Sequence, residues 1–154
     1  MPVETIEEAR TLIHNWMADR GYFIKEGDFI GYRFEFIGKF GNDTHFSIIQ
    51  PESLPRAVVV VSNVSVSAAH YDALSSMELK DREEFLWDLK REFIFLPSSF
   101  TFDPSFEQLG IPKSIQFSKE ISYDELTEGR LHEAVDYNSR CVLWVIWVFG
   151  KMLD

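Results

Sequence analysis

The chain of 154 residues is poor in the features that mark secreted and membrane-spanning proteins. It contains one cysteine, Cys141, so no disulfide can form within the chain. Its longest apolar run, residues 141–149, is far shorter than the roughly 20 residues that span a bilayer. Residues 1–5 are polar and acidic, unlike the cationic and apolar regions of a signal peptide. These features predict a cytoplasmic protein.

Positive charge is also scarce. The chain has 15 Lys and Arg against 25 Asp and Glu, which gives a formal net charge of -10. Nucleic-acid binding draws its affinity from Lys and Arg that neutralise phosphates, and anionic membrane surfaces repel an acidic protein. We therefore expect neither a nucleic-acid nor a membrane partner. The acidity itself indicates solubility, with a charge-steered partner as the alternative.

The motifs of common nucleotide, hydrolase and metal sites are missing. No Gly-rich run ends in the Lys and Ser or Thr of a P-loop, and the glycine pattern of a dinucleotide site is absent. There is no Gly-x-Ser-x-Gly elbow. The histidines are widely separated, whereas structural zinc sites use close pairs of ligands. The sequence predicts no cofactor and no metal.

Two features leave an alternative open. Glu128 lies four residues before His132, so a helix would place both on one face. They are interpreted as a surface ion pair, with half of a carboxylate-rich metal site as the alternative. Cys141 follows Arg140 but otherwise has apolar neighbours, so we expect a buried structural thiol rather than a nucleophile.

What the chain does contain is apolar and aromatic. Hydrophobic residues make up 45% and aromatic residues 15%, which is too much for a disordered chain. A chain of this length buries a sizeable core. We expect one domain that covers residues 1–154.

The first half is predicted to be a helix followed by strands. Helical spacing covers residues 3–20, and Gly21 can supply a left-handed cap. Residues 22–24 are a short extended piece. Residues 29–38, 44–50 and 57–61 read as three strands, with a turn at 41–43, and their short connections favour an antiparallel meander. The continuous apolar run at 57–61 predicts burial on both faces.

The second half returns to helices. Residues 67–76 are weakly helical, and residues 78–96 form a stronger helix that Pro97 ends. Residues 99–102 and 114–123 read as strands, with turns at 103–104 and 110–112. A final helix, which Asp124 can cap, continues to residue 149. Its apolar residues from 141 onward point in every direction, so we expect burial all round; a buried strand is the alternative.

The predicted order, α-β-β-β-α-β-β-α with a mainly antiparallel sheet, describes an α+β fold. It resembles the type III secretion chaperone-like fold, which the YbjN family shares, over residues 3–153. The opening Ala9-Arg10…Trp16 helix that runs into Gly21-Tyr22 is also similar to an uncharacterised archaeal family of domains of unknown function. The extra piece at 22–24 and the long connection 102–113 depart from the pattern. The resemblance implies a small acidic dimer that holds a partner polypeptide, and it transfers no site residues.

The remaining distinctive feature is an aromatic cluster near the end of the chain. Trp144, Trp147 and Phe149 are candidates for a partner surface because interfaces are rich in aromatic residues, with core packing as the alternative. The sequence thus predicts a non-catalytic protein-binding or chaperone-like module, a homodimer with a possible polypeptide client. The alternative is a small enzyme or small-molecule-sensing domain, in which carboxylates and histidines converge only in three dimensions.

Overall fold

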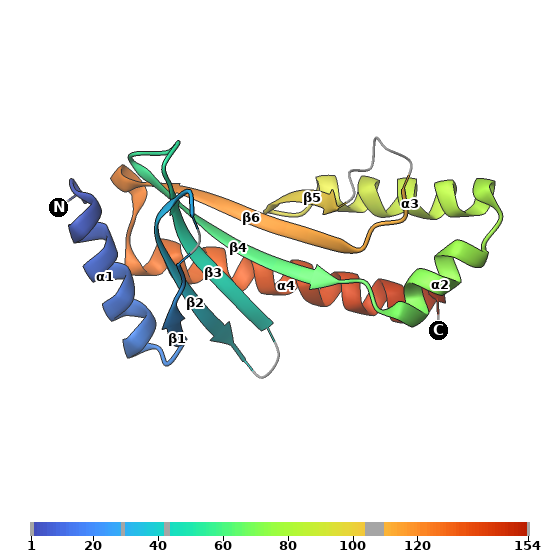
Figure 1. Cartoon of the computed structure of the whole chain (residues 1–154), viewed down its shortest axis with the longest axis horizontal. Coiled ribbons are helices and arrows are strands. Elements are labelled where there is room, and N and C mark those ends of the chain that lie inside the picture. Colours follow the sequence, from blue (N-terminus) through green and yellow to red (C-terminus); the bar gives the residue numbers. More distant parts are fainter. Residues whose placement is uncertain (1, 29, 42–43, 104–109, 154) are drawn as a thin grey trace.

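The computed structural model describes residues 2–28, 30–41, 44–103 and 110–153. Within these residues, four α-helices accompany one six-stranded antiparallel sheet (Figure 1). The helices are α1 (Ile6–Asp19), α2 (Ala68–Ser76), α3 (Leu79–Ile94) and α4 (Glu128–Leu153). The strands lie in the order β1-β2-β3-β4-β6-β5. They are β1 (Phe23–Glu26), β2 (Tyr32–Phe40), β3 (Thr44–Pro51), β4 (Ala57–Ser65), β5 (Ser99–Asp103) and β6 (Ser114–Ser122).

Helix α1 forms because its start is capped and one of its sides is apolar. The Thr5 side chain accepts a hydrogen bond from the backbone N–H three residues later, at 3.1 Å, and so satisfies a free donor of the first turn. The buried side consists of Ala9, Ile13 and Met17, which are four residues apart. Gly21 has a φ of 72° and closes the helix in the left-handed conformation that the sequence predicts.

The core of the sheet lies on the face that the helices cover. Phe36, Ile48 and Val60 are aligned across β2, β3 and β4, and all three are buried on this face. The meander of β2, β3 and β4 is therefore confirmed. On β4 the expected burial of both faces was wrong, because Val59 and Val61, which point to the other face, are only half-buried.

The core consists of two apolar clusters, and α4 contributes to both. The first cluster joins α1, β2, β3 and parts of β4 and β6 to the first half of α4, and the second joins α2, α3, β5 and the other parts of β4 and β6 to its second half. Figure 1 shows α1 at one end of the molecule, α2 and α3 at the other, and α4 running lengthwise between these ends. The 26-residue α4 therefore links the two clusters.

A small polar seam separates the two clusters. The side-chain amide of Asn138, which is fully buried, donates to the backbone oxygen of Val60 at 2.9 Å. Its side-chain oxygen accepts from the Ser98 hydroxyl at 2.6 Å. Lys119 Nζ donates to the backbone oxygen of Pro97 at 3.2 Å. The two bonds of Asn138 fix α4 against β4 and against the start of β5 at one height along the helix.

The element order differs from the predicted one at two places. The short extended piece is the paired strand β1, which is antiparallel to β2. The weakly helical residues form a separate helix, α2, because the Ser67 side chain caps it by accepting from His70 N at 3.1 Å. The order is therefore α-β-β-β-β-α-α-β-β-α. Phe29, Asn42 and Asp43 of the predicted strand and turn, and Pro104 of a later turn, lie outside the described residues.

The final helix begins later than predicted. Tyr123–Glu125 forms one turn of 3₁₀ helix, so Asp124 does not cap α4. Thr127 takes that role, because its hydroxyl accepts from Arg130 N at 3.1 Å. The helix that the sequence favoured over a strand is confirmed.

The polar seam gives a stability prediction. Replacing Asn138 with Ala leaves the Val60 carbonyl and the Ser98 hydroxyl without their buried partner, so we expect N138A to lower the free energy of unfolding by about 2–4 kcal/mol. Urea unfolding measures this change. The exposed Arg130→Ala substitution on the same helix should change the value by no more than about 0.5 kcal/mol. Equal values for the two variants would contradict the role assigned to the seam.

Candidate functional site

The three aromatic residues predicted as an interface do not share one environment. The side chains of Trp144 and Trp147 are 37% and 66% exposed, whereas Phe149 is only 2% exposed. The Phe149 ring lies 5.9 Å from the His70 ring and 5.7 Å from the Phe85 ring, both edge-on. Phe149 therefore belongs to the second cluster of the core, and its assignment to an interface is corrected.

Two aliphatic residues that the sequence prediction left out extend the exposed surface. Leu143 is 41% exposed and Ile146 is 50% exposed. With Trp144 and Trp147 they form a continuous outward side of α4, which we call the α4 apolar face. Burial all round was therefore a wrong expectation, because a stretch that is apolar on every side does not itself show which side faces the core. The buried residues of the stretch occupy the opposite side of the helix: Cys141, Val142, Val145 and Phe149.

The apolar face begins abruptly along α4. In the first half of the helix the exposed side chains are charged, as at Arg130, Glu133 and Arg140. Arg140 pairs with Asp136 one turn earlier, with an N–O distance of 3.1 Å. Beyond Arg140, the next exposed charge on α4 is Lys151. The α4 apolar face is thus a local patch that is bordered by charge at both ends.

A second exposed apolar patch lies on α3 and has a different character. Trp87 is 59% exposed and Ile94 is 64% exposed. Charged side chains are interleaved with them, because Asp88, Lys90 and Arg91 line the same shallow hollow. Lys90 Nζ lies 5.2 Å from the centroid of the Trp87 ring, in a cation–π contact that already covers part of the ring. The α4 apolar face has no charge within it and is the stronger candidate for a binding surface.

A small polar cluster lies between α1 and α4. Tyr22 Oη is 2.7 Å from His132 Nδ1, and Arg20 Nε is 3.2 Å from Glu128 Oε1. Glu128 and His132, considered in the sequence as an ion pair or as half of a metal site, therefore each have a partner near α1 rather than one another. The cavity beside them has a volume of about 10 Å³, which is room for a single water molecule.

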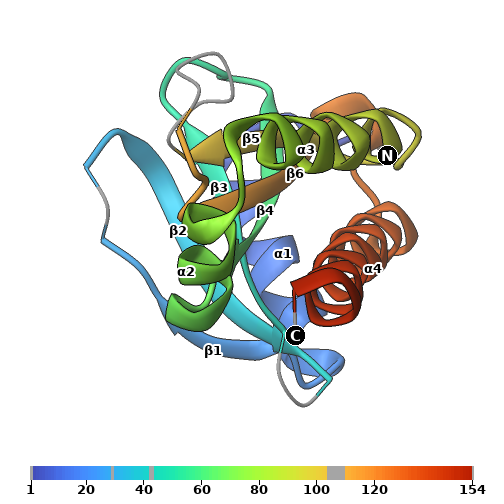
Figure 2. The same ribbon diagram turned by 90° about the vertical axis from the view of Figure 1, so that its right-hand side faces the viewer.

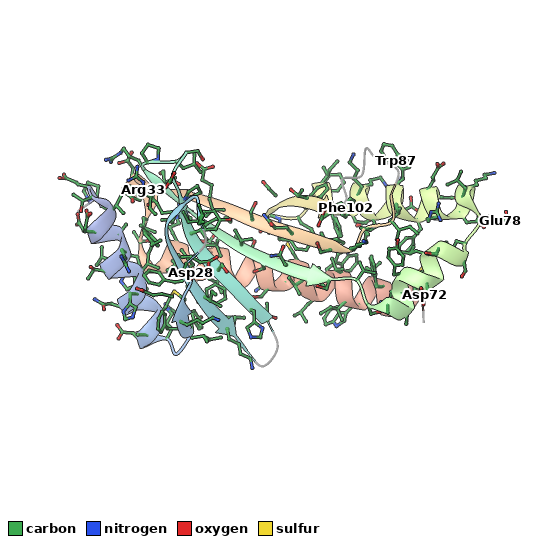
Figure 3. All side chains as sticks on the ribbon, in the orientation of Figure 1. Asp28, Arg33, Asp72, Glu78, Trp87 and Phe102 are labelled. Carbon is green, nitrogen blue, oxygen red and sulfur yellow. The ribbon has the colours of Figure 1, made fainter. Side chains whose placement is uncertain are left out.

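Larger hollows among the described residues are open to solvent. One is lined by both signs of charge, including Arg10, Glu26 and Arg33, and there Arg10 forms an exposed ion pair with Glu26 at 2.9 Å. Figure 3 shows the labelled Asp28 and Arg33 at the α1 end, away from Trp87 on α3. Across the described ranges no three His, Cys, Asp or Glu side chains gather in a way that could hold a metal ion.

None of the described helices, α4 included, combines the length and the apolar character needed to cross a membrane.

Comparison with known proteins places the chain in a family. The model of the uncharacterized conserved protein family DUF2299 matches residues 9–149. The chain belongs to the DUF2299 family. No curated protein matches it.

The fold of this DUF2299 member also occurs in a solved structure. The crystal structure of an uncharacterized protein from Methanothermobacter thermautotrophicus superposes with a TM-score of 0.87 at 22% sequence identity. The match covers 95% of this chain and 99% of that one. The likeness shows a shared fold. The expected membership of an uncharacterised family is confirmed, and the resemblance to the chaperone-like and YbjN fold stays a prediction.

The single cysteine of this DUF2299 member, Cys141, is buried, and this burial lowers the reactivity of its thiol. Cys141 is 1% exposed and packs in the second cluster. Burial raises the pKa of the Cys141 thiol, because the charged thiolate loses its hydration, and hydrogen bonding with Ser98 offsets only part of this rise. A thiol in this state is a poor nucleophile.

The thiol environment can be tested directly. We expect a thiol reagent such as dithionitrobenzoate to modify Cys141 in the folded protein more than about 100-fold more slowly than in the unfolded protein, because modification needs local opening. The rate is followed by absorbance. A second cysteine placed on the exposed side of α4, Glu133→Cys, serves as the control and should react quickly. Rapid modification of Cys141 in the folded chain would show that the thiol is accessible and ionised.

Proposed function

We propose that this DUF2299 member is a non-catalytic protein-binding module and that the α4 apolar face is its binding surface. The observation that carries the proposal is the exposure of two tryptophans, Trp144 and Trp147, beside Leu143 and Ile146 on one side of a rigid helix. Tryptophan is enriched at the centres of protein interfaces because it offers a large contact area with few rotatable bonds.

Trp147 has the largest exposed fraction of the four side chains in the α4 apolar face. About two-thirds of this side chain is in contact with water, with an exposed fraction of 66%. Covering it removes on the order of 150 Å² of apolar surface from water, which is worth about 4 kcal/mol before the costs of association. One central residue of this kind can supply a large share of the affinity of a small interface.

The element order supports a chaperone-like class for this module. When β1 and α2 are set aside, the order is the helix, three strands, helix, two strands and helix of the type III secretion chaperone-like fold that the sequence resembles. That resemblance implies a dimer that holds a polypeptide client. We therefore count a second copy and a client polypeptide as the partners of this surface.

A tagged chain expressed in the cells it comes from tests this function. We expect the wild-type chain to purify with a bound polypeptide, which native mass spectrometry identifies as a second copy or another protein. Trp147→Glu should lose that polypeptide, because the new charge would be buried in the contact without a partner. Its melting temperature should stay near the wild-type value, because the residue contributes little to the core.

A matched control uses the charged half of the same helix. Arg130→Glu also changes an exposed residue of α4 but lies outside the apolar face, so it should keep the bound polypeptide. The proposal fails if wild type and W147E retain the same polypeptide, or if neither of them binds any.

A further inference from the structure

We draw no further inference here: the strongest candidate, the exposed apolar patch that Trp87 and Ile94 form on α3 at the end of the molecule that faces the viewer in Figure 2, has charged side chains between these two residues, and nothing in the part of the chain that the structure describes shows which partner would cover it.

Discussion

The packing of the inner side of α4 against the sheet is the contact on which the rest of the structure depends. Val135 at one end and Val142, Val145 and Phe149 at the other place this helix in both apolar clusters. The strands β4 and β6 also run between the two ends of the molecule (Figure 1), so α4 and these two strands join the clusters together. Asn138 fixes the position of the helix along β4, because its two buried hydrogen bonds form at only one register.

This arrangement also explains why the outer side of α4 is available for binding. A helix that is held by its inner side on a sheet keeps its backbone in place when a partner covers the outer side, so little backbone conformational entropy is lost. The change from charged residues before Leu143 to tryptophan and aliphatic residues after it has no counterpart in the core, which is formed by the opposite side. The exposure of these apolar residues supports the proposal that they serve a partner and not folding.

Much of the fold could be predicted from the sequence, because hydrophobic periodicity and the residues that begin or end helices and strands are local properties. The cap of α1 at Gly21, the meander and the stop of α3 before Pro97 each depend on a few neighbouring residues. The errors lie where tertiary contacts decide. Asp124 and Thr127 are both good caps, and only the turn at Tyr123–Glu125 selects between them. Residues 141–149 are apolar on every side, so composition alone does not show that Phe149 faces the core and Trp147 faces outward.

The most direct test is to ask whether Trp144 and Trp147 become covered when two chains meet. Hydroxyl-radical footprinting of the unmodified chain, read out by mass spectrometry at dilute and at concentrated protein, reports the accessibility of each tryptophan. We expect oxidation of Trp144 and Trp147 to fall several-fold on concentration, while oxidation of the exposed Trp87 on α3 is unchanged. Equal oxidation of Trp144 and Trp147 at both concentrations would contradict the claim that a second chain covers this face.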